Sequence, residues 1–223
     1  MCQEVYIMKI NMTQWIQDTI SSPVKKAMPI LSFPGVQITG HTVEEMVRDG
    51  HLQAECMKAV ADRFDTGAAF SLMDLSVEAE AFGSPVHYSE DEVPTVTAAL
   101  VHEEDEAEAL KVPEVGAGRT GECVKGIREV TEMITDRPVL AGIIGPFSLA
   151  GRILDMTEIM ILCYEEPEMV ETVLGKGSAA SQISRGCGRW RSRSAPARPH
   201  LSEGTLPPGC MPWTLISRRN HAC

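Results

Sequence analysis

Residues Phe70–Gly83 read FSLMDLSVEAEAFG, and the prediction of the fold starts from them. The apolar run Ala68–Met73 is long enough for one strand buried on both faces, as strands of a parallel sheet are. Asp74 follows it, and Leu75–Phe82 has the spacing of a short helix that Gly83 would terminate. Because α/β barrels keep their catalytic residues at the carboxyl ends of strands, Asp74 is the candidate catalytic residue. The alternative is that Asp74 only caps the following helix by accepting backbone N–H bonds.

Predicted helices and strands alternate along the rest of residues 1–175. Thr42 and Glu45 have the spacing of a capping box, at the start of a helix that runs to about Phe64 and is divided at Gly50. The other predicted elements are strands at Met28–Phe33 (followed by a loop at Gly35–Gly40) and Pro138–Ile144, an extended piece at Pro85–Tyr88, and helices at Thr13–Ile20, Glu122–Thr135, Met156–Tyr164 and Pro167–Leu174. This alternation predicts βα units around a parallel sheet.

The simplest closed form of such a sheet is a (β/α)8 TIM barrel, which typically takes about 250 residues. Only residues 1–175 carry the alternation of helices and strands. The predicted fold class is therefore α/β, a TIM-barrel fold truncated to a partial barrel.

Charge divides the chain into two parts near Gly175. Residues 1–175 contain 12 Lys and Arg against 30 Asp and Glu, whereas residues 176–223 contain 8 against 1. We therefore predict a partial barrel domain over residues 1–175 and a basic, poorly ordered tail over residues 176–223. A tail rich in Arg, Ser and Pro is a candidate for binding RNA or an anionic surface.

A change of reading frame explains this tail better. Reverse translation of Ser194–His200 with a shift of one nucleotide allows Ala-Pro-Leu-Pro-Gly-Leu-Ile, which reads as an apolar loop. The nucleotide sequence tests this hypothesis, since a gene without a sensible continuation in either shifted frame would refute it.

Composition also excludes several classes of function. An acidic body lacks the basic face that a nucleic-acid-binding surface needs, and no apolar run approaches the roughly 20 residues that span a bilayer. The seven cysteines form no CxxC pair and follow no secretory signal, which predicts reduced thiols in the cytoplasm.

The acid-rich segment Val101–Leu110 reads as an exposed helix face rather than a metal cage. Pro113–Gly121 reads as a Gly-rich linker, because it lacks the spacing of a phosphate-binding loop.

Two blocks carry a resemblance to a known family. Residues 74–83, DLSVEAEAFG, and residues 138–150, PVLAGIIGPFSLA, resemble the corresponding segments of the uroporphyrinogen decarboxylase superfamily, and their order and separation match as well. The form EAEAFG is closer to the corrinoid-dependent branch, the methylcobamide:coenzyme M methyltransferase-like proteins. The acidic turn Glu165–Glu168 is similar to a turn of the same family. The resemblance covers the N-terminal part of such a protein and implies a TIM barrel.

The decarboxylase branch implies one set of roles. There, an aspartate at the position of Asp74 meets the pyrrole nitrogens of the substrate, and an arginine-rich N-terminal motif holds its carboxylates. This chain offers Lys25 and Lys26 and no arginine before Arg48. Uroporphyrinogen decarboxylation is therefore the alternative reading.

The methyltransferase branch implies zinc, which activates a thiol acceptor, and a corrinoid carried by a partner protein, which supplies the methyl group. The family's His-x-Cys and distant Cys ligands fall in its C-terminal half, and residues 1–175 match none of them. His221 and Cys223 have the right spacing but lie in the aberrant tail, so we assign no metal ligand, and the cofactor-binding residues are unknown. We interpret three further cysteines as small apolar residues, namely Cys56, Cys123 and Cys163. We interpret two histidines, His41 and His87, as isolated structural residues.

The main hypothesis is thus a relative of enzymes that move a methyl group from a corrinoid protein to a thiol, with this chain itself inactive. The alternatives are a uroporphyrinogen decarboxylase that binds a small-molecule tetrapyrrole, and a non-catalytic fragment or interaction protein. Neither nucleic acid nor membrane is an expected partner. Stoichiometric zinc favours the first hypothesis, bound porphyrin the second, and neither signal with poorly cooperative melting the third.

Overall fold

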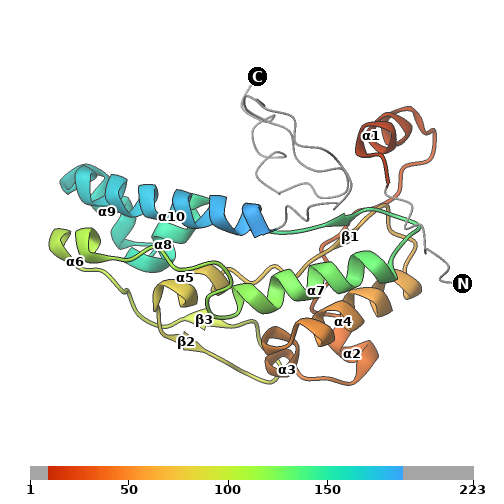
Figure 1. Ribbon diagram of the computed structural model, residues 1–223, viewed down its shortest axis with the longest axis horizontal. Helices are drawn as coiled ribbons and strands as arrows, with labels where there is room; N and C mark the ends of the chain where they lie inside the picture. Colours follow the sequence, from red (N-terminus) through yellow and green to blue (C-terminus); the bar gives the residue numbers. More distant parts are fainter. Residues whose placement is uncertain (1–9, 188–223) are drawn as a thin grey trace, which may run out of the picture.

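The computed structural model describes residues 10–187, and Figure 1 shows their path as a ribbon coloured along the sequence. The elements follow in the order α1 (Met12–Ser21), α2 (Gly35–Thr39), α3 (Val43–Arg48), α4 (Gly50–Arg63), β1 (Ala69–Phe70), α5 (Val77–Phe82), β2 (Val86–His87), β3 (Thr95–Val96), α6 (Glu104–Ala109), α7 (Thr120–Met133), β4 (Val139–Leu140), α8 (Pro146–Leu154), α9 (Glu158–Glu165) and α10 (Pro167–Cys187).

Strands β1 and β4 form a parallel pair in the middle of the molecule. Ala69 lies opposite Val139 and Phe70 opposite Leu140, and all four residues are buried. The pair is extended by the N–H of Ser71, which donates to the carbonyl of Leu140 at 3.0 Å. The predicted parallel arrangement of Ala68–Met73 and Pro138–Ile144 is confirmed, although the regular strands are shorter than predicted.

The predicted strand at Met28–Phe33 is wrong, and so is the loop at Gly35–Gly40, where α2 stands instead. Pro29 has no N–H to donate to a ladder, which disfavours a regular strand inside a sheet. The segment still lies beside β1, but a side chain makes the contact: the hydroxyl of Ser32 donates to the carbonyl of Ser71 at 2.6 Å. The described strands thus form one parallel pair and the antiparallel hairpin β2–β3, which is an α/β arrangement.

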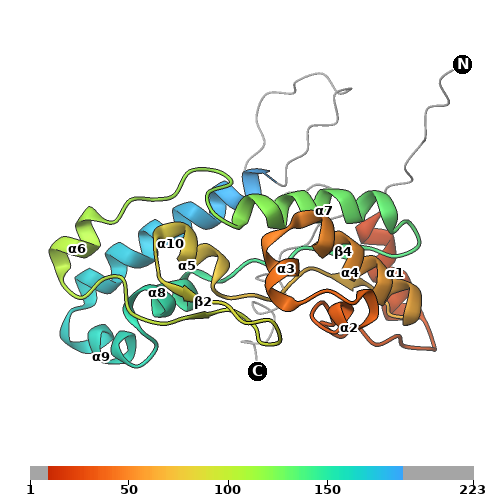
Figure 2. The same ribbon diagram turned by 90° about the horizontal axis from the view of Figure 1, so that it is seen from below.

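Helices pack against both faces of the strand pair: α4 and α7 on one face and α1 on the other. Ala69 and Val139 pack with apolar residues of α4, of α7 and of the C-cap of α7, namely Ala54, Met57, Ala61, Val130 and Ile134. Because side chains alternate along a strand, Phe70 and Leu140 point the other way, where they pack with Met12 of α1. A separate core joins α8, α9 and α10 at the other end of the molecule, as Figures 1 and 2 show.

Local signals place α3 and α4 as predicted. The hydroxyl of Thr42 accepts the N–H of Glu45 at 3.2 Å, and the carboxylate of Glu45 accepts the N–H of Thr42 at 2.9 Å, which is a complete capping box. The helix breaks before Gly50, where Asp49 caps α4 through the N–H of His51. These polar caps lie within a few residues of one another, so the sequence alone was sufficient to predict them.

Three features differ from the prediction. The hairpin β2–β3 pairs the predicted extended piece with Thr95–Val96, and α8 occupies Pro146–Leu154, where no helix was predicted. Helix α10 runs past Gly175, where the charge of the chain changes sign, to Cys187. The predicted domain boundary stays a prediction, and most of the basic tail lies outside the described residues. Within residues 10–187, no helix is long and apolar enough to cross a membrane.

Two glycines allow the closest helix contact in the fold. A Cβ on Gly50 would lie 2.4 Å from the carbonyl oxygen of Glu122, and one on Gly126 would lie 2.8 Å from the carbonyl oxygen of Gly50. Helices α4 and α7 therefore meet backbone to backbone, and this contact sets the position of α7 relative to the strands.

Replacement of Gly126 by alanine tests this contact. Although alanine favours helix formation, the added methyl group must push α4 and α7 apart, so we expect Gly126→Ala to lower the free energy of unfolding by about 1–3 kcal/mol. Gly175→Ala is the matched control, since nothing lies within 4 Å of its added Cβ in α10, and it should be neutral or stabilising by up to about 1 kcal/mol. Urea unfolding of both variants measures the difference. Equal effects would contradict the close contact.

Candidate functional site

Asp74 lies just beyond the carboxyl end of β1, and its side chain is 0% exposed. One carboxylate oxygen accepts the N–H of Ser76 at 2.8 Å and the hydroxyl of Ser76 at 2.6 Å. The other oxygen forms an ion pair with the guanidinium of Arg119. Asp74 therefore closes the turn that leads into α5 and also takes part in a buried ion pair. The two predicted roles of Asp74, capping and site chemistry, are not exclusive in this geometry.

Arg119 is the centre of the cluster around Asp74. Its side chain is only 6% exposed and comes from the residue that precedes α7. The guanidinium donates to the carboxylates of Asp74 and Glu80, and its remaining terminal nitrogen donates to the hydroxyl of Ser76 at 2.8 Å. Burial alone would lower the pKa of Arg119, but the hydrogen bonds and negative charges of the two carboxylates outweigh burial and raise it. We call Asp74, Ser76, Glu78, Glu80 and Arg119 the Arg119 cluster.

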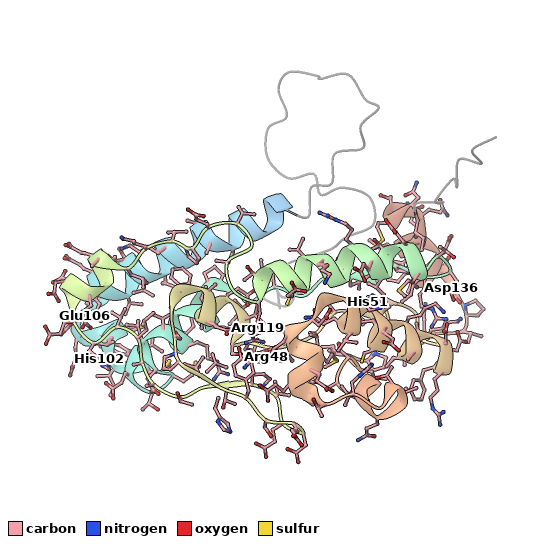
Figure 3. All side chains as sticks on the ribbon, turned by 60° about the horizontal axis from the view of Figure 1, so that its bottom comes forward. Arg48, His51, His102, Glu106, Arg119 and Asp136 are labelled. Atoms are coloured by element: carbon pink, nitrogen blue, oxygen red, sulfur yellow. The ribbon has the colours of Figure 1, made fainter. Side chains whose placement is uncertain are left out.

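The hairpin reaches this cluster through Tyr88. The phenol of Tyr88 donates to the second oxygen of Glu80, and its ring lies 5.1 Å from the guanidinium of Arg119. On the solvent side, the exposed guanidinium of Arg48 lies 3.7 Å from the centre of the same ring, and Figure 3 shows Arg48 and Arg119 together there. Burial, together with the hydrogen bond to Glu80, raises the pKa of Tyr88 to about 12, so its proton remains on the phenol at neutral pH.

A second network joins the segments that follow β1 and β4. The hydroxyl of Ser71 accepts the N–H of Gly142 at 2.7 Å, and Glu78 accepts the N–H of Ile144 at 3.4 Å. These bonds bring the two strand ends together, as parallel pairing requires. The predicted strand-end site is thus a set of polar groups held between the two strands and α7.

Among the described side chains, no metal site forms around Cys56, Cys123 or Cys163. Burial raises the pKa of Cys56 and raises that of Cys123 to about 12, so neither thiol readily becomes the thiolate that zinc prefers, whereas Cys163 is exposed. Within residues 10–187, no group of three or more His, Cys, Asp or Glu side chains has the arrangement of a metal site. The residues present therefore do not fit the zinc that the resemblance implies. His221 and Cys223 lie outside the described residues.

The remaining predicted sites have ordinary surroundings. His41 lies 3.4 Å from the carboxylate of Glu55, and His87 is an exposed residue of β2. The acidic residues from Glu103 to Glu106 and Glu108 are exposed in and beside α6, as the sequence predicted.

Sequence reasoning missed Arg119, Glu80 and Tyr88. Arg119 belongs to the segment Pro113–Gly121, which read as a linker because of its glycines. A single arginine beside a predicted amphipathic helix was the available signal. Its partner Asp74 lies 45 positions earlier in the chain, so no local spacing pointed to the pair.

Removal of the Arg119 charge tests whether the cluster depends on it. Arg119→Met would leave Asp74 and Glu80 without a cation in a buried place, so we expect unfolding to become easier by about 3–5 kcal/mol. Arg48→Met is the control, because Arg48 is exposed and its stacking on Tyr88 contributes no more than about 1 kcal/mol. Chemical denaturation measures both, and similar small effects would show that Arg119 is not a buried counter-ion.

Comparisons with known proteins identify relatives of this chain. Two curated relatives, both named Methylcobamide:CoM methyltransferase MtbA, match over 141 residues: that of Methanosarcina acetivorans is 30% identical and that of Methanosarcina mazei is 29% identical. Each match covers 57% of this chain and 42% of the relative, so the matched region spans about two fifths of the relatives' length.

A solved structure described as a methyltransferase from Methanosarcina mazei has the same fold over 80% of this chain and 56% of its own, with a TM-score of 0.67 and 20% sequence identity. The family described as Uroporphyrinogen decarboxylase (URO-D) matches residues 14–182, which include β1, β4 and every member of the Arg119 cluster. The chain belongs to the uroporphyrinogen decarboxylase (URO-D) family.

Proposed function

We propose that this chain is part of a methyltransferase of the URO-D family that moves a methyl group from a corrinoid protein to a thiol acceptor. The observation that carries the proposal is the 30% identity to a methylcobamide:CoM methyltransferase over 141 residues. In this proposal the parallel pair β1–β4 is a section of a (β/α)8 barrel, and the carboxyl ends of the strands form part of its active site.

The burial of Asp74 favours methyl transfer over porphyrinogen decarboxylation. A carboxylate that meets pyrrole N–H groups needs open lone pairs, but Asp74 is 0% exposed and already accepts bonds from Ser76 and Arg119. The lysines that stand where a decarboxylase would need arginines are also engaged. Lys25 donates to carbonyls at the end of α1 at 2.7 and 2.8 Å, and Lys26 pairs with Asp65 at 2.6 Å.

For Asp74 we propose a role in the site that acts through Arg119. The ionised carboxylate holds the guanidinium, and the guanidinium in turn holds Glu80 and the hairpin residue Tyr88. Asp74 thereby fixes the shape and charge of the strand end and does not itself touch the ligand. This is a positioning role, and it uses the same strand-end location that made Asp74 the candidate catalytic residue.

We further propose that the 223-residue chain has little or no activity by itself. The described residues do not fit a zinc site, and the matched region spans about two fifths of the curated relatives. When bound, zinc would supply thiol activation from another part of the full-length protein. The corrinoid would arrive on a partner protein.

An assay of methylcobalamin demethylation with coenzyme M tests this proposal. The purified 223-residue protein should show no turnover above background and much less than one zinc per chain by mass spectrometry. A full-length version, continued in the shifted reading frame, should bind zinc and turn over. Zinc-dependent turnover by the 223-residue protein would refute its inactivity, and a bound porphyrin spectrum would favour the decarboxylase.

Asp74→Asn in that full-length protein tests the positioning role. Asparagine keeps the shape and a good capping group but removes the charge that holds Arg119. We expect kcat to fall and the free energy of unfolding to fall by about 3–5 kcal/mol, while KM for the thiol stays nearly constant. Thermal melting and steady-state kinetics measure these quantities. Unchanged kcat and stability would leave Asp74 as a simple cap.

A further inference from the structure

Glu78 is a third carboxylate beside Arg119, and it has no cation of its own. It stands in the first turn of α5, and one of its oxygens accepts the N–H of Ile144, which lies between β4 and α8. Its carboxyl group therefore lies beside the segment that follows β4. Among the side chains that the structure describes, no Lys, Arg or His forms an ion pair with Glu78, whereas Asp74 and Glu80 each pair with Arg119.

The charges around Glu78 do not balance if every acid is ionised. The groups that act on it electrostatically are Asp74, Arg119 and the thiol of Cys123. Arg119 supplies one positive charge, which two carboxylates already share. An ionised Glu78 would add a further negative charge to this half-buried place, where a charged carboxylate without a cation is much less stable than in water. Protonation of Glu78 removes that excess at no cost in hydrogen bonds, because a protonated carboxyl still accepts the N–H of Ile144.

We propose that Glu78 is the acid of the Arg119 cluster that takes up a proton most readily, and that its protonated carboxyl group donates a hydrogen bond to a ligand at the ends of β1 and β4. Asp74 and Glu80 each form an ion pair with the guanidinium of Arg119. A protonated carboxyl is a hydrogen-bond donor, so the ligand group that it suits is a lone-pair acceptor such as a thiolate or a carbonyl oxygen.

The direction of the pKa shift supports this assignment. Burial raises the pKa of Glu78, and the negative charge of Asp74 raises it further. The backbone N–H groups of Glu78 and Ile144 and the charge of Arg119 oppose the shift, but the pKa remains above its usual value. The inference deepens the proposed function by naming the acid of that site. It concerns the folded chain, however, and holds whichever reaction the family member performs.

The pH dependence of stability tests the inference on the 223-residue protein. When folding raises the pKa of an acid, the acid loses its proton at a lower pH in the unfolded chain than in the folded chain. Its contribution to the free energy of unfolding therefore falls as the pH rises from the ordinary glutamate range to the folded pKa. Above the folded pKa this contribution stays constant. Glutamine imitates the protonated carboxyl. We therefore expect Glu78→Gln to match the wild type near pH 4 and to become progressively more stable than it as the pH rises above the ordinary glutamate range.

Glu80→Gln is the matched control, because it lies in the same helix and its charge is held by Arg119 and by the phenol of Tyr88. This variant should be less stable than the wild type near neutral pH. If Glu78→Gln is destabilised there like Glu80→Gln, or keeps the wild-type pH slope, Glu78 is ionised and the inference is wrong.

A second measurement decides the question even where unfolding is not cooperative. Carbon-13 labelling of the glutamate carboxyl groups allows each to be titrated by NMR, and the Glu78 signal is the one missing from Glu78→Gln. We expect this signal to titrate well above the ordinary glutamate pKa of about 4.3, and a titration at or below that value would overturn the proposal. Neither result depends on methyl transfer, so failure of the activity assay and failure of this inference are distinguishable.

Discussion

The buried guanidinium of Arg119 holds together parts of the chain that are far apart in sequence. It joins the turn after β1, helix α5 and the start of α7, and through Glu80 it reaches the hairpin residue Tyr88. Burial of an arginine is costly, and its ion pairs compensate only because all of its partners are correctly placed. The pair therefore contributes less to net stability than to specificity, because any arrangement that separates these segments leaves buried charges without partners.

Packing elsewhere in the fold brings Arg119 to this place. Helices α4 and α7 approach closely because Gly50 and Gly126 carry no side chains, and apolar residues of both helices cover one face of the β1–β4 pair. Arg119, the residue that precedes α7, is then directed toward the carboxyl end of β1. A small change in the separation of α4 and α7 would move the guanidinium away from Asp74, so the apolar packing and the buried charge cluster depend on one another.

The strand end combines fixed charges with one carboxyl group that lacks a cation. Two acids are compensated by Arg119, and Glu78 lies nearby with only backbone N–H donors. In α/β barrels the active site is assembled from several strand ends, and in the function that we propose this chain would supply one part of such a site. The chain covers 56% of the length of the solved methyltransferase that shares its fold.

Much of the local structure was predictable from sequence, because it depends on groups a few residues apart. The capping box of Thr42 and Glu45, the break at Gly50 and the end of α5 at Gly83 all follow from local hydrogen bonding and backbone preference. The buried strand at Ala68–Met73 and the position of Asp74 at its end were also predictable. A short apolar run between predicted helices is typical of a buried strand in an α/β fold. The same reasoning failed at Met28–Phe33, where Pro29 favours a side-chain contact over a ladder.

The tertiary structure alone decided which charges meet. The sequence by itself determined the family, the α/β class, the pair of parallel strands and the position of Asp74 at a strand end. It did not determine that Asp74 and Glu80 would share Arg119, or that Glu78 would have no cation, because these residues lie about 40 positions from the arginine. Local propensities act over a few residues, whereas an ion pair depends on the packing of whole helices that brings distant segments to the same place.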